Sequence, residues 1–211
     1  DNTVIRKDKG ASWFTNQVAQ STTNAHKECN VSPGTNLSEI VHSLESGSII
    51  ILPKGTYPIQ RSILIDKPLT IRAADPGNKP LIRFNGDKPD NMVTIADGGE
   101  LKIENIAFDG VLEPGKALAK AGISTAFDMI QPYTLTVDGC EFQNFGEGGF
   151  FAIKGTKATF AKSVTIRNCF FRDLSGDAIN YAAEKDDIGR YNADDMLIEN
   201  CSFYRLLGLP I

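Results

Sequence analysis

The chain has 211 residues, of which 41% are hydrophobic and 23% are charged, and its formal net charge at pH 7 is −4. This length suffices for one large domain with a buried core. The negative charge argues against a general surface for nucleic acid or anionic membranes. No apolar run approaches the roughly 20 residues that a membrane-spanning helix needs.

Residues 1–34 fit none of the patterns that follow, so we expect a linker or an irregular leading segment there. An amphipathic helix is predicted within Thr35–Gly47, because apolar residues recur there with helical spacing. Asn36 suits the N-cap, with Glu39 as its capping-box partner, and the final glycine is placed to end the helix. A helix in this place would cover one end of a stack of strands.

One short motif recurs along the rest of the chain. Its copies begin at Leu101, Leu135, Val164 and Met196, with a degenerate copy at Leu69. Apolar residues alternate within each copy, as in a β-strand, and then the alternation slips by one residue. The slip falls at Asn105, Gly139, Asn168 and Asn200, residue types that adopt left-handed backbone at low cost. Each copy therefore predicts a strand, a sharp bend and a second strand, repeated at a period typical of solenoids.

Residues after the bend also align in columns. One column holds Cys140, Cys169 and Cys201, and the next holds Phe108, Phe142, Phe171 and Phe203. Stacking of successive turns, about 4.8 Å apart, explains such columns. The cysteines could form a metal or redox set, but no CxxC motif or histidine cluster accompanies them. This pattern favours a file of small buried thiols. Stacked asparagines at the bends could likewise hydrogen-bond along the file.

The remaining segments complete the predicted fold. Further β-like stretches are Asn91–Ala96, Phe127–Ile130, Phe150–Gly155 and Ala178–Ala183. Two stretches break the rhythm: Gly110–Ala126, predicted as a partly helical insertion, and Ala183–Asp195, predicted as a charged loop. The sequence thus predicts an all-β fold, a right-handed parallel β-helix (solenoid) with an N-terminal amphipathic capping helix, over residues 35–211. Because no cap follows the last copy, we expect this domain to be truncated at its C-terminal end.

Three stretches carry a resemblance to a known family. The predicted capping helix is followed by GSIIILPKGTYPI, then by LTIRAADPGNKPLI with its turn at Asp75–Gly77, and then by rungs of the IENIAF type. Over residues 35–211 this combination resembles polysaccharide lyase family 6, the group of chondroitinase B and the alginate lyases. The rung motif alone is shared by pectate lyases, pectinesterases and adhesins, so the combination carries the resemblance.

The resemblance implies a right-handed parallel β-helix from a protein that cleaves acidic polysaccharides by β-elimination. Some members carry two such helices in series, and GASWF at Gly10–Phe14 is similar to the junction between them. The implied role of this chain is therefore the second, non-catalytic β-helix, preceded by a catalytic one. No position matches the family's catalytic Lys and Arg or its calcium-binding carboxylates, so none is carried over. Ca²⁺ remains a candidate cofactor of the full-length protein only.

β-Elimination from a uronic acid needs a group that neutralises the carboxylate, a base and an acid. The best local constellation joins Lys154 with Lys185, Arg190 and Tyr191, because strand ends of neighbouring turns share one edge of a solenoid. We interpret these four residues as a cationic substrate-binding subsite for an anionic sugar. The alternative is a set of solvated loop charges, paired with Glu184, Asp186 and Asp187.

Two further residue groups have weaker functional interpretations. The acidic residues of the charged loop could bind Ca²⁺, although their spacing matches no calcium-binding repeat. They are Glu184, Asp186, Asp187, Asp194 and Asp195. The aromatic residues predicted to be exposed, and so able to stack on sugar, are Tyr181, Tyr191, Phe150 and Phe151.

These observations favour a chain that is part of a polysaccharide lyase-like protein. That protein would act on an anionic uronic-acid polysaccharide, with alginate as the first candidate, and this chain would be inactive by itself. The family resemblance implies a secreted, periplasmic or cell-surface location, since such polymers lie outside the cytoplasm. One alternative is a carbohydrate-binding or surface-display β-helix with no lyase activity. Another is the catalytic helix itself, truncated before its active turns.

Overall fold

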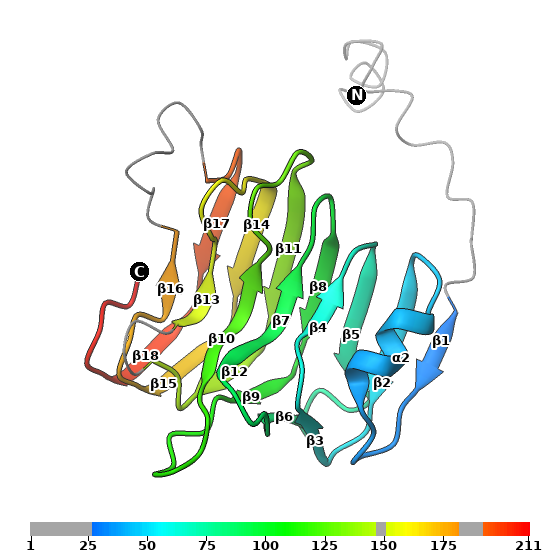
Figure 1. The fold of residues 1–211 in the computed structure, drawn as a ribbon, viewed down its shortest axis with the longest axis horizontal. Helices are drawn as coiled ribbons and strands as arrows, with labels where there is room; N and C mark the ends of the chain where they lie inside the picture. Colours follow the sequence, from blue (N-terminus) through cyan, green and yellow to red (C-terminus); the bar gives the residue numbers. More distant parts are fainter. Residues whose placement is uncertain (1–26, 147–150, 182–191) are drawn as a thin grey trace, which may run out of the picture.

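The computed structural model describes residues 27–146, 151–181 and 192–211. It is an all-β, right-handed parallel β-helix, in which each full turn adds one strand to each of three parallel sheets (Figure 1). The seven-stranded sheet contains β1 (Glu28–Asn30), β2 (Ser48–Leu52), β5 (Leu69–Ala73), β8 (Glu100–Glu104), β11 (Tyr133–Asp138), β14 (Ala161–Arg167) and β17 (Met196–Glu199). No described helix is long and apolar enough to cross a membrane.

Along the chain, each strand of the seven-stranded sheet from β2 to β14 is followed by one strand of the six-stranded sheet and then by one strand of the five-stranded sheet. The six-stranded sheet contains β3 (Thr56–Ile59), β6 (Leu81–Phe84), β9 (Ala107–Asp109), β12 (Glu141–Gln143), β15 (Phe170–Leu174) and β18 (Ser202–Leu206). The five-stranded sheet contains β4 (Ile63–Ile65), β7 (Asp90–Ile95), β10 (Ala119–Thr125), β13 (Phe151–Lys154) and β16 (Ile179–Asn180). The predicted degenerate copy at Leu69 is confirmed, since Leu69 pairs in register with Leu101.

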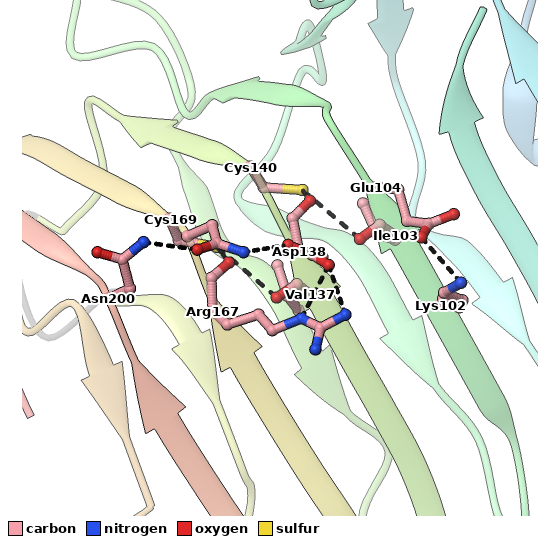
Figure 2. Close-up of polar contacts among 10 residues, drawn as sticks. Lys102, Ile103, Glu104, Val137, Asp138, Cys140, Arg167, Cys169 and Asn200 are labelled. Carbon is pink, nitrogen blue, oxygen red and sulfur yellow. Dashed lines mark hydrogen bonds and ion pairs between the residues drawn. The ribbon is translucent and has the colours of Figure 1, made fainter. Parts of the chain in front are cut away.

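The predicted bends between the seven- and six-stranded sheets are confirmed. Their central residues have φ values of 57° at Asn105, 65° at Gly139, 55° at Asn168 and 50° at Asn200. Along the file, Nδ2 of Asn200 donates to Oδ1 of Asn168 at 2.6 Å, and Nδ2 of Asn168 donates to Oδ1 of Asp138 at 2.8 Å (Figure 2). A Cβ at position 139 would clash with the Asn105 side chain, so glycine fits where the asparagine file is interrupted.

The predicted inward columns are also confirmed. The rings of Phe108, Phe142, Phe171 and Phe203 stack with centroids 4.9, 5.2 and 5.2 Å apart. The thiols of Cys140, Cys169 and Cys201 each lie 3.7 Å from a carbonyl oxygen of the preceding turn, and those carbonyls belong to residues paired in register. All three cysteines are free. Burial raises the pKa of the Cys169 thiol to about 12, which is the behaviour of core residues rather than of metal ligands.

The capping helix α2 (Leu37–Ser43) covers the N-terminal end of the core and packs against β4 and β3. Its N-cap is Asn36, whose side chain accepts from the N–H of Ser38 at 3.3 Å and donates to Oε1 of Glu39 at 2.9 Å. The helix is shorter than predicted. It ends at Ser43 because the C-cap residue, Leu44, already has extended backbone, and Gly47 instead forms the turn into β2 with a φ of 81°.

Two predictions about the third strand of a turn were wrong. Phe127–Ile130 is a turn rather than a strand, held by two backbone N–H groups that donate to Oδ1 of Asp97. The strand is β10, which lies inside the insertion predicted to be partly helical and pairs with β7 and β13. Its buried positions carry the small residues Ala119, Ala121 and Gly122, which give little hydrophobic periodicity.

Strand β1 lies inside the segment expected to be irregular and pairs with β2, while the boundary at residue 34 stays a prediction. The buried side chains form one continuous core along the axis of the β-helix, enclosed by the three sheets. The outward side chains of each sheet therefore form rows that cross successive turns, and such rows are where a ligand could contact several turns at once.

Candidate functional site

The candidate site lies on the outer face of the five-stranded sheet. Inward isoleucines and valines alternate on its strands with outward side chains. Pairing places one outward residue of each strand at the same level, and this row consists of Leu64, Thr94, Ser124, Lys154 and Asn180. The row is polar apart from Leu64, and Lys154 lies in it between the buried Ser124, which is 2% exposed, and the amide of Asn180.

Lys154 ends β13, and its side chain is half-buried. Its Nζ lies 4.4 Å from the centroid of the Phe151 ring, a cation–π contact of the kind worth about 0.5–1 kcal/mol at exposed sites. Its strand neighbour Asn180 donates through Nδ2 to Oδ2 of Asp177 at 3.0 Å. No carboxylate of the described residues lies within ion-pair distance of Lys154.

The other three residues of the predicted subsite, Lys185, Arg190 and Tyr191, lie outside the described residues. So do Glu184, Asp186 and Asp187 of the predicted acidic group, and Phe150. The described chain leaves β16 at Tyr181 and returns at Asn192, one turn beyond Lys154. This topology puts both ends of the intervening segment at the edge of the sheet where Lys154 lies. Because three of its four residues are outside the described residues, the subsite stays a prediction.

Tyr181 was predicted to be exposed, and this prediction was wrong. Its side chain packs against the core, and its hydroxyl oxygen is buried, as is that of Tyr133. Burial raises the pKa of Tyr133 to about 12 and that of Tyr181 well above its usual value. A Cβ on Gly155 would clash with the Tyr181 ring, which shows how closely the chain folds over this side chain.

Among the described residues, the exposed aromatic side chains that sequence reasoning missed are Phe127, which is 71% exposed, and Tyr204, which is 54% exposed. Phe127 was missed because its segment was assigned to a strand. Tyr204 could have been found from alternation, since it directly follows the inward Phe203 on β18. Tyr204 also carries the Arg205 guanidinium 4.8 Å from its ring centroid, so its face is partly occupied.

The chemistry available on the five described strands of this sheet is limited. They carry Lys120, Lys154 and Asp90 together with hydroxyl and amide side chains, and they contain no arginine, histidine or tyrosine. Among the described residues, no group of three or more His, Cys, Asp or Glu side chains is arranged to hold a metal ion. The described strands of this face therefore carry Lys154 as a half-buried cation, but they do not supply a base paired with an acid for elimination.

The fold is similar to solved structures of one enzyme. They are described as the structure of PL6 family alginate lyase AlyGC and the structure of a mutant of it. The mutant structure matches 92% of this chain with a TM-score of 0.74, and the other matches 85% with a TM-score of 0.73, each at 26% sequence identity. The matched regions make up 26% and 24% of those chains, so this chain spans about a quarter of their length. The fold thus defines a polysaccharide lyase-like parallel β-helix.

Sequence comparison gives the family. The model of a family described as "Domain of unknown function (DUF4957)" matches residues 55–188, from β3 to beyond β16, and the chain belongs to that family. No curated protein matches the chain.

Proposed function

We propose that this chain is a non-catalytic β-helix domain of a polysaccharide lyase-like protein that acts by β-elimination on an anionic uronic-acid polysaccharide, alginate first. The observation that carries the proposal is the similarity of 92% of this chain to an alginate lyase of which it matches only a quarter. In this proposal a preceding catalytic β-helix performs the elimination. The intact protein works where such polymers occur, as a secreted, periplasmic or cell-surface protein.

The composition of the five-stranded face supports the non-catalytic part of the proposal. A base for C5 of the sugar and an acid for the leaving oxygen must lie within hydrogen-bond reach of one substrate. Lys154 is the half-buried cation on the described part of this face, and the tyrosines at its edge, Tyr133 and Tyr181, have buried hydroxyl groups. A face of this kind binds polymer without cleaving it.

Binding is assigned to Lys154 together with Lys185, Arg190 and Tyr191. In this assignment the three cations neutralise carboxylates of successive sugars, and Tyr191 stacks on a ring. Contact with Phe151 holds the Lys154 ammonium near the sheet, where partial burial makes its attraction to a carboxylate stronger than in bulk water. Long-range attraction of this type weakens as salt is added.

The first experiment tests for catalysis. The 211-residue chain is incubated with alginate, with and without Ca²⁺, and the ultraviolet absorbance of unsaturated uronate ends is followed. We expect no rise in absorbance from this chain, and a rise from the full-length protein. A calcium-dependent rise from this chain alone would show that it is itself catalytic.

The second experiment tests the binding subsite. We expect the double variant Lys154→Ala, Arg190→Ala to bind an alginate affinity gel about tenfold more weakly, since loss of roughly 1.4 kcal/mol changes affinity tenfold. The matched control is the double variant Lys102→Ala, Arg72→Ala, which also removes two positive charges, but from the seven-stranded sheet, where each of these residues pairs with a glutamate, at 2.8 and 2.9 Å respectively. Equal retention of the wild type and the double variant would remove the subsite.

The second candidate function is a carbohydrate-binding or surface-display β-helix from a protein with no lyase activity. The favouring observation is again the five-stranded sheet, whose described strands carry the cation Lys154 but no arginine, histidine or tyrosine that could complete an elimination site. Assay of the full-length protein separates the two functions, because only the first predicts unsaturated products. The third interpretation, a truncated catalytic helix, predicts that the same activity depends on residues that follow this chain.

A further inference from the structure

A second candidate site surrounds residues 110–118, which connect β9 to β10 and are called the 110–118 loop here. The loop projects beyond the sheets at the bottom of Figure 1, at the edge between the six- and five-stranded sheets. It precedes β10, whereas Lys154 ends the neighbouring strand β13, so the two places lie at opposite ends of the five-stranded sheet. The predicted subsite does not include this region.

The loop is fixed to the six-stranded sheet by charged side chains. Arg83 of β6 forms an ion pair with Glu113 of the loop, and its Nε lies 3.6 Å from Oδ2 of Asp109. Asp109 is only 7% exposed, and its Oδ1 accepts from the N–H of Val111 at 3.0 Å and from Nδ2 of Asn144 at 2.8 Å. Both carboxylate oxygens of Asp109 therefore make contacts that hold the base of the loop.

The backbone of the loop is strained at one point. Val111 has a φ of 63°, in the left-handed region that β-branched residues avoid, and the bond from its N–H to Asp109 holds it there. The base is closed by a bond from the N–H of Ala119 to the carbonyl of Gly110 at 3.1 Å. Backbone strain that the surrounding structure maintains is common at ligand sites, so the strained Val111 is consistent with a binding site beside this loop.

The loop separates two surface cavities, of about 300 and 440 Å³. Both are lined by Glu113 and Lys116, which stand between them. The smaller cavity is also lined by Thr56, Pro58, Arg83 and Asn85. Volumes of this size match small-ligand sites, which combine apolar walls with a few converging polar groups.

The lining suits a sugar ring. Pro58 and Ala117 give apolar surface, while Arg83, Asn85 and Glu113 give planar polar groups that can pair with neighbouring hydroxyls. The charged groups that line the smaller cavity are two cations, Arg83 and Lys116, and one anion, Glu113. Lys116 is exposed and forms no ion pair with any described residue, so one positive charge is left for the ligand.

We propose that the cavities beside the 110–118 loop form a second saccharide site, which takes a uronate residue with Lys116 on its carboxylate and with Arg83, Asn85 and Glu113 on its hydroxyls. The site is separate from the Lys154 subsite, and only the choice of a uronate as ligand rests on the proposed function. An acidic polymer bound at both places would cross the five-stranded sheet from one edge to the other.

The test is titration of the 211-residue chain with a mannuronate trisaccharide, followed by calorimetry and by backbone amide NMR shifts. We expect shifts at Val111 and Gly115, and a loss of affinity of about tenfold for Lys116→Gln and about threefold for Asn85→Ala. Both substitutions are at exposed positions, so neither should prevent folding. The matched control is Lys88→Gln, another exposed lysine outside both cavities, which should bind as the wild type does.

The outcomes separate this inference from the proposed function. If Lys154→Ala weakens binding while Lys116→Gln and Asn85→Ala do not, the second site is wrong and the Lys154 subsite stands. If only the loop variants weaken binding, the second site stands and the Lys154 subsite falls. Equal binding of a neutral mannose trisaccharide at the loop would overturn the uronate assignment. No binding of the uronate by the wild type would overturn both proposals.

Discussion

The two ends of the β-helix differ in what lies over them: the helix α2 lies at the N-terminal end, and the strands β17 and β18 form the described C-terminal end (Figure 1). At the N-terminal end, α2 lies over the core, and its Leu37 and Val41 are 0% and 1% exposed. At the C-terminal end, β17 and β18 form the last described strands, and Met196, which continues the inward column of Val164, is 39% exposed. The difference arises although β17 repeats the motif of β14 in register.

Single columns make the contrast quantitative. Leu69, Leu101, Leu135 and Val164 are at most 3% exposed, and Met196 occupies the next place in the same register column. The motif therefore determines where a side chain points, whereas the following turn determines whether it is buried. Stability in such a fold is a sum over neighbouring turns, so equal residues in one column should contribute unequally.

The largest expected effect compares two members of the phenylalanine column. Phe142 is fully buried between Phe108 and Phe171, and Phe142→Ala should lower the free energy of unfolding by about 3–5 kcal/mol. Phe203 stacks on Phe171 alone and is only partly buried, so Phe203→Ala should cost no more than about half as much. Urea unfolding followed by circular dichroism measures both. Equal losses would mean that the last turn is covered as well as the inner ones.

The second effect concerns the cap. Leu37→Ala removes a fully buried side chain from α2 and should lower the free energy of unfolding by about 2–3 kcal/mol, because the covered end then resembles the open one. Leu209 is 65% exposed near the other end, and Leu209→Ala should change stability by less than about 0.5 kcal/mol. Thermal unfolding of the two variants gives the comparison. A neutral Leu37→Ala would show that α2 is not needed to cover the core.

The sequence predicted those parts of the fold that repeat. Inward columns, bends and the capping helix all leave a local or periodic signal, as at Asn105 and Asn168, where residue type alone marks a left-handed bend. Strand β10 left no such signal, because a small residue is required there by distant contacts. A Cβ on Gly122 would lie 2.8 Å from the carbonyl oxygen of Ala152 and 3.0 Å from the ring of Phe142.

The candidate sites were less predictable for the same reason. Lys154 could be placed at a strand end because β13 was predicted, but whether it has an acidic partner depends on packing. The cavity at the 110–118 loop depends on Arg83 of β6 and on Asp109 and Glu113 of the next turn, which lie about 30 residues further along the chain. None of these residues is unusual in its local sequence, so only the assembled turns bring them together.

The smallest expected effect concerns the outer surface, where a following turn should stabilise the charge of Asp138. Asp138 accepts from Nδ2 of Asn168 at 2.8 Å and from Nε of Arg167 at 2.8 Å, both in the next turn (Figure 2). Partial burial would raise the pKa of Asp138, but these hydrogen bonds and the charges of Arg167 and Lys102 outweigh burial and lower it. The ionised form of Asp138 is therefore favoured by folding.

A lowered pKa in the folded state gives stability that is present above the unfolded pKa, about 3.9, and is lost as the pH falls through the folded value. Asp138→Asn should thus cost about 1 kcal/mol near neutral pH, and the difference from the wild type should shrink toward zero in acid. Urea unfolding at neutral and acidic pH measures it. Asn200→Gly is the control, because it keeps a residue suited to the φ of 50° but removes an amide that bonds Asn168 instead. Its cost should not depend on pH, and a pH-independent cost for Asp138→Asn would show that the next turn does not stabilise this charge.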